Sequence, residues 1–218
     1  MKAVINETVL TLNTHSEMFS PNAPDTGTLA MLSLTEIKED DKVLDLGCGS
    51  GIIGIYAAKL IGADNVVMTD KSDIAAEYAK RNAELNGVGE ITVYCGDGYE
   101  NIPDRNFTLI MSNPPYHTDF SVSKTFIEGG YKRLLTGGRM VMVTKREEWY
   151  KNKLTSVFGG VKVAKLNGYY IFTAEKRQAN KTKKIRVKEK NKLSKKLERK
   201  YGKRKKAELY SPLLHINS

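Results

Sequence analysis

Two short motifs in this chain combine residue types that can do chemistry, and each follows an apolar run. Ser112-Asn113-Pro114-Pro115-Tyr116 comes directly after the run from Phe107 to Met111. Asn113 offers a side-chain carbonyl and Pro114 a backbone carbonyl, so two acceptors can hold the two hydrogens of a planar amino group. The two prolines stiffen the loop, and Tyr116 offers a ring on which a nucleobase can stack. We therefore predict that Asn113, Pro114 and Tyr116 are catalytic residues acting on such an amine.

The second motif, Asp45-Leu46-Gly47-Cys48-Gly49-Ser50-Gly51, has the composition of a cofactor cradle. A glycine-rich turn also marks dinucleotide sites, but that fingerprint needs glycine at the sixth place of GxGxxG, where this chain has Ile52. A carboxylate at a strand end suits a cationic ligand, and glycines let the backbone approach closely. S-adenosylmethionine carries an ammonium and a sulfonium group. We predict that its binding residues include Asp45, Gly47, Gly49 and Gly51.

Two further carboxylates follow strand-like segments. Asp70 ends the segment Val66 to Thr69 and is predicted to accept hydrogen bonds from the ribose hydroxyls of the cofactor. Asp97, in Cys95-Gly96-Asp97-Gly98, is predicted to accept from the adenine amino group, with an Asx-type turn as an equally weighted alternative. Asn113 is expected to contact the cofactor as well as the substrate.

Together the motifs predict methyl transfer to an sp2 nitrogen. The lone pair of an exocyclic amine is delocalised into the π system, so the enzyme must favour the transition state in which that nitrogen becomes tetrahedral and cationic. Two carbonyl acceptors that aim the lone pair at the methyl group serve this purpose. No strong general base is then required.

The elements that must position these motifs follow an alternating pattern. Strand-like segments at 43–46, 66–69, 91–95, 107–111 and 139–144 alternate with helix-period segments at 52–61, 73–86, 120–135 and 147–158. Segments 161–166 and 169–174 flank Asn167-Gly168 and predict a C-terminal antiparallel hairpin. The pattern predicts an α/β fold with a Rossmann-like, doubly wound, mostly parallel seven-stranded sheet. In such sheets ligands bind beyond the carboxyl ends of the strands.

Two regions flank the alternating segments, one before residue 42 and one after residue 175. Residues 1–41 form a lead-in with a strand within Val4 to Leu12, a loop with two prolines and a helix from Thr26 to Leu34. Gly137-Gly138 is expected to stop the helix that reaches Leu135. Residues 1–175 are predicted to be the catalytic domain and residues 176–218 a Lys/Arg-rich extension.

The extension carries the charge of the chain. Between Lys176 and Lys206 there are 17 Lys and Arg against two Glu, whereas the remaining sequence holds 18 basic and 23 acidic residues. A solvated tail is one interpretation. We favour a contact with RNA phosphates, driven by counterion release, and ribosomal RNA or a ribosomal subunit as the partner. A short helix is expected here because Leu193, Leu197 and Tyr201 recur at helical spacing.

Several function classes are not supported by the composition. No stretch approaches the roughly 20 apolar residues of a membrane span, and the first residues lack the apolar segment of an export signal. Cys48 and Cys95 form no CxxC or Cys/His cluster. We therefore expect a cytoplasmic protein with no metal site and no membrane partner.

The sequence resembles the methyltransferase small domain family, particularly its small-subunit ribosomal RNA guanine-N2 methyltransferases. The resemblance runs from about Met18 to Lys176 and rests on segments that share spacing and residue type, namely Phe19-Ser20 through Asp25-Thr26-Gly27-Thr28, Asp45 to Gly51, Arg81 to Gly87, Ser112 to His117, Phe158-Gly159-Gly160 and Gly168-Tyr169. The resemblance implies a class I, S-adenosylmethionine-dependent enzyme. It also implies that the lead-in lines the cofactor and target pockets, which adds Asp25, Gly27 and Thr28 to the predicted binding residues.

The leading interpretation is an RNA N-methyltransferase acting on guanine N2 of small-subunit ribosomal RNA. Adenine N6 of transfer or ribosomal RNA presents the same kind of amine. Protein glutamine methyltransferases use a similar motif on a side-chain amide, and a non-catalytic RNA-binding assembly factor could keep the fold. These alternatives stay open at the level of the sequence.

Overall fold

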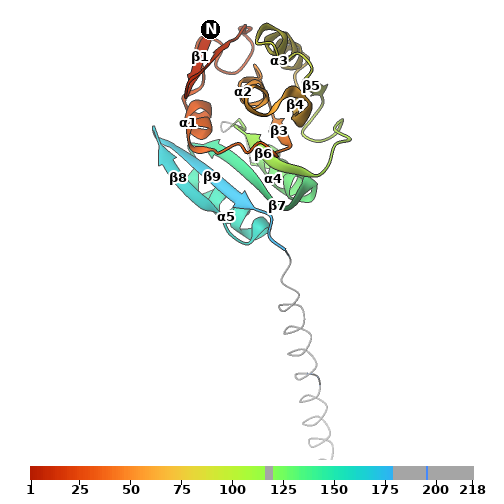
Figure 1. The fold of residues 1–218 in the computed structure, drawn as a ribbon. Helices are drawn as coiled ribbons and strands as arrows, with labels where there is room; N and C mark the ends of the chain where they lie inside the picture. Colours follow the sequence, from red (N-terminus) through yellow and green to blue (C-terminus); the bar gives the residue numbers. More distant parts are fainter. Residues whose placement is uncertain (116–119, 179–194, 196–218) are drawn as a thin grey trace, which may run out of the picture. The chain divides into compact units, whose positions relative to one another are not determined.

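The computed structural model describes residues 1–115, 120–178 and Lys195 (Figure 1). By its internal contacts the chain divides into two units, Met1–Arg177 and Gln178–Ser218. The first unit contains all the helices and strands reported below. The predicted helix of the basic extension lies outside the described residues, as does Tyr116.

Seven strands form one sheet in the order β5-β4-β3-β6-β7-β9-β8 (Figure 1). In this spatial order the five strands β5, β4, β3, β6 and β7 are each parallel to their neighbours among them. Strand β9 is antiparallel to both β7 and β8. This confirms the predicted mostly parallel sheet with a C-terminal hairpin. The strands are β3 (Val43–Leu46), β4 (Val66–Asp70), β5 (Thr92–Cys95), β6 (Phe107–Ser112), β7 (Leu134–Thr144), β8 (Lys162–Leu166) and β9 (Tyr169–Glu175).

Helices cover both faces of the sheet and enclose two apolar cores. Because side chains alternate along a strand, Val43 of β3 points into one core and Leu44 into the other. On the first face lie α1 (Thr26–Leu34), α2 (Ile52–Ile61) and α3 (Asp73–Leu85), with a short 3-10 turn at Ala63–Asn65 after α2. On the second face lie α4 (Ser121–Arg133) and α5 (Glu147–Phe158).

The lead-in begins with a hairpin, whereas the sequence predicted a single strand within Val4 to Leu12. Strands β1 (Lys2–Ile5) and β2 (Thr8–Thr11) pair antiparallel around a two-residue turn. Asn6 takes a positive φ of 51° there, which Asn tolerates better than most residues. The single-strand prediction was therefore wrong at this turn, because Asn6-Glu7 lacks the glycine that usually announces one.

The end of α4 also differs from the prediction. The helix ends at Arg133, and Leu134 already pairs with Phe107 as the first residue of β7. Gly137-Gly138 lies inside this long strand and does not stop the helix. Gly137 has a φ of +88°, and the register of β7 against β6 shifts just after Phe107. An irregular strand can absorb such a glycine pair, so the pair marks a distortion of the strand.

The strand order reverses between β3 and β6, which lie side by side at the centre of the sheet. The glycine loop leaves the carboxyl end of β3 and the Asn113 loop leaves the carboxyl end of β6. Ser112 ties the two ends together, because its Oγ donates to the carbonyl oxygen of Leu46 at 2.7 Å. Both motifs therefore sit at the switch point, where doubly wound sheets bind ligands.

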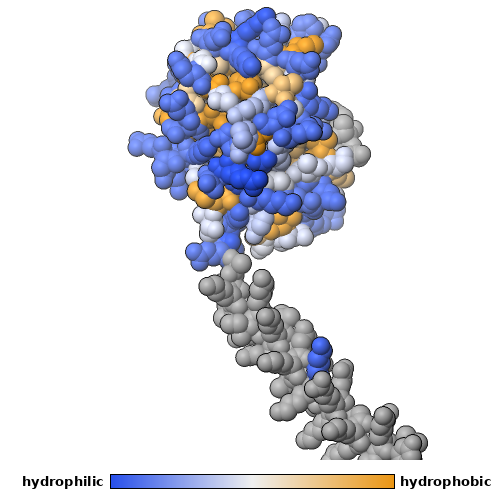
Figure 2. Space-filling model, turned by 90° about the vertical axis from the view of Figure 1, so that its right-hand side faces the viewer, coloured by the Kyte–Doolittle hydropathy of each residue, from blue (hydrophilic) through white to orange (hydrophobic). Residues whose placement is uncertain are grey.

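The helices of the described residues are short, the longest having 13 residues. None of the helices in this part of the chain is long and apolar enough to cross a bilayer. On the face that Figure 2 displays, hydrophilic side chains predominate and apolar side chains form separate patches.

Candidate active site

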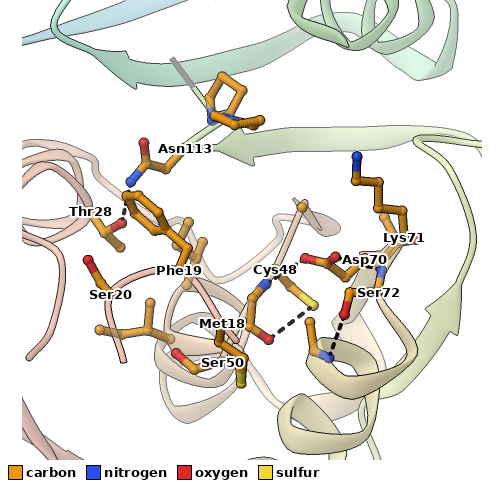
Figure 3. Close-up of a pocket in the computed structure, with 18 of the residues that line it drawn as sticks. Met18, Phe19, Ser20, Thr28, Cys48, Ser50, Asp70, Lys71, Ser72 and Asn113 are labelled. Carbon is orange, nitrogen blue, oxygen red and sulfur yellow. Dashed lines mark hydrogen bonds between the residues drawn. The ribbon is translucent and has the colours of Figure 1, made fainter. Parts of the chain in front are cut away.

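A cavity opens at the carboxyl ends of β3, β4 and β6, between the glycine loop and the Asn113 loop (Figure 3). The structure brings most of the predicted site residues to its wall: Asp25, Thr28, Gly47, Gly49, Asp70, Asp97, Asn113 and Pro114. Three others lie outside this wall, namely Gly27, Asp45 and Gly51.

The glycine loop is shaped by hydrogen bonds to the next strand. The amides of Gly47 and Cys48 both donate to the carbonyl oxygen of Thr69 at 2.9 Å. The amide of Gly49 donates to Oδ2 of Asp70, also at 2.9 Å. Gly47 and Gly49 both have positive φ values, 75° and 54°, which glycine adopts without strain. The loop is therefore held open toward the cavity by β4.

Asp70 and Asp97 differ in how firmly they are held. The second oxygen of Asp70 accepts from the amide of Ser72 at 3.0 Å. Ser72, rather than Asp70, caps α3, because its hydroxyl accepts from the amide of Ala75. Asp97 is exposed, and its carboxylate accepts no hydrogen bond from the part of the chain that the structure describes. The Asx-turn alternative for Asp97 thus finds no support in the described contacts.

Asp45 lies behind the glycine loop and is fully buried. Its Oδ2 accepts from the amide of Gly54 in the first turn of α2 at 2.9 Å, whereas Oδ1 is buried without a hydrogen-bond partner among the described residues. Burial raises the pKa of Asp45 to about 7; the Gly54 amide lowers it, and the carboxylate of Asp70 raises it. A cation nearby would favour the charged form, so this carboxyl is chemically suited to a positively charged ligand.

Asn113 is held by the first turn of α1. Its Nδ2 donates to Oδ1 of Asp25 at 2.7 Å and to Oγ1 of Thr28 at 2.9 Å, the latter drawn in Figure 3. The Oδ1 atom of Asn113 is buried and has no hydrogen-bond partner within the described residues. Oδ1 is thus an unsatisfied acceptor on a residue that lines the cavity. Pro114, next in the chain, is buried and lines the same cavity.

Gly27 and Gly51 serve packing. A Cβ on Gly27 would lie 2.6 Å from ring atoms of Tyr169 on β9. Gly51, at the N-cap of α2 with a φ of +83°, would place a Cβ 3.2 Å from Ile55 and from Met68. Both glycines therefore allow close approach of the elements that carry the site.

Sequence reasoning missed the role of Asn82 on α3. This fully buried side chain donates to the carbonyl oxygens of Asn13 and Ser50 and accepts from the amide of Asn13. It thereby links the lead-in to the glycine loop. The signal was present, because Asn82 occupies the buried, otherwise alanine-rich face of α3. Phe19, which belongs to the lead-in segment expected to line the pockets, and Lys71, which no sequence motif singled out, both line the cavity and are labelled in Figure 3.

Among the described residues no group of His, Cys, Asp and Glu could hold a metal ion.

The family model of the methyltransferase small domain matches residues 9–173. This chain belongs to the methyltransferase small domain family. The match includes the glycine loop, the Asn113 loop and the C-terminal hairpin, so the family resemblance inferred from the sequence is confirmed.

The curated relatives of this methyltransferase small domain protein include enzymes named for both ribosomal subunits. It is 32% identical over 74% of its length to ribosomal RNA small subunit methyltransferase C of Serratia proteamaculans. It is 30% identical over 77% of its length to ribosomal RNA large subunit methyltransferase G of Ectopseudomonas mendocina. The chain spans about half of these relatives, 47% and 46% of their lengths. It spans 86% of the uncharacterized protein YbxB of Bacillus subtilis, at 30% identity.

Solved structures agree with the fold. The 16S rRNA N2 G1207 methyltransferase RsmC of T. thermophilus, determined with AdoMet and guanosine, superimposes with a TM-score of 0.71 at 26% identity. That similarity covers 81% of this chain and 50% of the other. A methyltransferase of Pyrococcus furiosus has a TM-score of 0.65 at 19% identity, covering 78% and 90% of the two chains. It shows the shared fold alone.

Proposed function

We propose that this chain is an S-adenosylmethionine-dependent N-methyltransferase that acts on an exocyclic amine of ribosomal RNA, with guanine N2 of the small subunit as the favoured target. One observation carries the proposal. Asn113, whose Oδ1 is buried and without a partner among the described residues, lines a cavity together with the glycine loop. An amine acceptor and a cofactor cradle at one switch point support methyl transfer to nitrogen.

The residues present fit the proposed cofactor. The glycine loop provides close backbone approach, and Asp45 keeps a buried, unpartnered oxygen behind it. Asp70 and Asp97 reach the same cavity, at the ends of β4 and β5. S-adenosylmethionine, when bound, supplies a methyl group on a positively charged sulfur. We assign Asp70 to the ribose hydroxyls and Asp97 to the adenine amine.

Asn113 and Pro114 are the proposed acceptors for the two hydrogens of the substrate amine. As the nitrogen bonds to the methyl carbon it gains positive charge, and its hydrogens become stronger donors. Two carbonyl oxygens placed in advance stabilise this developing charge without reorganising. The cationic nitrogen that would result is acidic enough to release its proton to solvent water, so no strong base is needed. Tyr116 keeps its proposed stacking role and lies outside the described residues.

The relatives support ribosomal RNA as the substrate class, because enzymes named for each ribosomal subunit match this chain. The structure of T. thermophilus RsmC holds guanosine together with AdoMet, which supports guanine as the target base. The predicted cytoplasmic location stays a prediction.

Nucleoside mass spectrometry tests the proposal. Ribosomal and transfer RNA from cells with and without the gene would be compared, and the deficient RNA would be methylated with purified protein. We expect N2-methylguanosine to be lost and then restored in small-subunit RNA. N6-methyladenosine would move the target to adenine. An unchanged nucleoside profile in both RNAs would contradict an RNA substrate and favour a protein glutamine or a non-catalytic role.

The basic extension is proposed to supply RNA phosphate contacts. Lys176 belongs structurally to the catalytic unit, because its backbone pairs with Gly137 and Gly138. A truncation should therefore begin after Arg177. We expect it to weaken RNA binding and to flatten the dependence of log affinity on log salt, since that slope counts the phosphates neutralised. An unchanged slope would refute the phosphate contact. Circular dichroism checks that the truncated protein folds.

A further inference from the structure

The side chain of Asn113 is oriented by a carboxylate from a distant part of the chain. Oδ1 of Asp25 receives three donors: the amide of Thr28 at 2.8 Å, the hydroxyl of Thr28 at 3.2 Å, and Nδ2 of Asn113 at 2.7 Å. Asp25 is at the same time the N-cap of α1. The N-terminal end of this helix and the loop after β6 are thus joined through this oxygen and through Oγ1 of Thr28, which also accepts from Asn113.

The chemistry of this cluster permits one orientation of the amide. An ionised carboxylate only accepts hydrogen bonds, so the group of Asn113 that faces Asp25 must be the NH2. Oγ1 of Thr28 uses its hydrogen on Asp25 and accepts the second N–H of Asn113. Both hydrogens of the amide are therefore engaged, and Oδ1 is left buried and without a partner.

A buried carbonyl oxygen without a partner costs on the order of 1–3 kcal/mol. Rotating the amide by 180° would not relieve this cost, because Oδ1 would then face the carboxylate oxygen of Asp25. The structure therefore holds an unsatisfied acceptor in a fixed place. Unsatisfied buried groups in folded proteins call for an explanation, and a ligand that donates there is one.

We propose that Asp25 and Thr28 are positioning residues that lock the amide of Asn113 with Oδ1 toward the substrate, so that the site accepts an N–H donor and rejects a carbonyl edge. This inference rests on the proposed function and deepens it. Asp25 and Thr28 act through Asn113 here, whereas the sequence resemblance suggested that they bind the cofactor. Discrimination follows because a base that presents a carbonyl oxygen would face Oδ1 with lone pair against lone pair.

Matched variants separate positioning from folding. Ser and Asn are both good N-cap residues, so Asp25→Ser and Asp25→Asn should preserve α1. Only Asn reaches Asn113 with an acceptor oxygen. We expect Asp25→Ser to lower kcat about 10- to 100-fold, the scale of a misplaced catalytic group, with Asp25→Asn retaining more of the activity. Thr28→Val should lower kcat and Thr28→Ser should largely restore it, while the affinity for S-adenosylhomocysteine stays within about twofold in all four variants.

A readout that needs neither substrate nor cofactor completes the test. In a nitrogen-15 NMR spectrum, the side-chain NH2 of Asn113, assigned with an Asn113→Asp sample, should exchange slowly with water in the wild type and faster in Asp25→Ser and Thr28→Val. Unchanged exchange and kcat in these variants would overturn the inference. So would a loss confined to S-adenosylhomocysteine affinity, which would make the pair cofactor ligands. If the wild type methylates no RNA while Asn113 exchange depends on Asp25, the proposed function fails and the positioning contact stands.

Discussion

The glycine loop and the Asn113 loop face the same cavity but are held in place in different ways. The glycine loop is bonded to Thr69 and Asp70 of the neighbouring strand, and the bond from Gly49 to Asp70 spans 21 residues of sequence. Asn113 is bonded to Asp25 and Thr28, which are 88 and 85 residues away. The bonds of Gly47, Cys48 and Gly49 therefore stay within one βαβ unit, whereas those of Asn113 depend on the docking of the lead-in.

Removing the Asn113 side chain should have the largest effect and should separate the two loops. We expect Asn113→Ala to lower kcat about 10²–10³-fold, the cost of losing one preorganised polar group at the transition state. Because the glycine loop does not depend on Asn113, affinity for S-adenosylhomocysteine should change little. Single-turnover kinetics and calorimetry measure the two effects. Parallel losses of affinity and rate would show that the two loops are coupled.

Substitution of Gly51 should damage the glycine loop. An alanine there must adopt a φ of +83° and place its Cβ 3.2 Å from Ile55 and Met68. We expect Gly51→Ala to lower the free energy of unfolding by about 2–3 kcal/mol, since a left-handed conformation alone costs about 1–2 kcal/mol. Gly87→Ala is the matched control: φ is +71°, but no described atom lies within 4 Å of its Cβ. Equal losses in urea denaturation would refute the role of packing.

Substitution of Asn82 tests whether the glycine loop also depends on the hydrogen bonds that Asn82 makes to Ser50 and to the lead-in. Asn82→Ala would remove three part-buried hydrogen bonds to the backbone of Asn13 and Ser50, at a cost of roughly 1–3 kcal/mol in total. Asn86→Ala is the control, because its bonds to Thr11 are exposed and water can replace them. We expect Asn82→Ala to lose more thermal stability and more S-adenosylhomocysteine affinity than Asn86→Ala. Similar losses would mean that the link from Asn82 to Ser50 contributes nothing specific.

The raised pKa of Asp45 predicts that the stability of the folded protein depends on pH. Its pKa in the folded protein is raised to about 7 from 3.8, so the folded state binds more protons than the unfolded state between those values. Its contribution to stability therefore declines as pH rises from about 4 to 7, by up to about 1.4 kcal/mol per pH unit. Asp45→Asn removes this titration. The unfolding free energy of the variant relative to the wild type should increase over that window, and a constant difference would contradict the raised pKa.

Much of the fold was predictable because it depends on local patterns. Apolar runs of strand length alternate with helix-period segments, and this order alone implies a doubly wound sheet. The turn in β1–β2 and the end of α4 were missed for a shared reason. Asn6 and Leu134 have no local signal that outweighs their neighbours, and their conformations are decided by pairing with other strands.

The sequence by itself determined which residues are the candidates for the proposed chemistry: the three glycines after β3, and the asparagine and prolines after β6. Only the tertiary structure decided how they act. It buried Asp45 behind the glycine loop. It also brought Asp25 next to Asn113, and this contact fixes the Asn113 amide in one of its two possible orientations, with Oδ1 left as an unpaired acceptor. The reason is physical. Residue types fix which hydrogen bonds are available, whereas burial and contacts across 88 residues decide which of them are made.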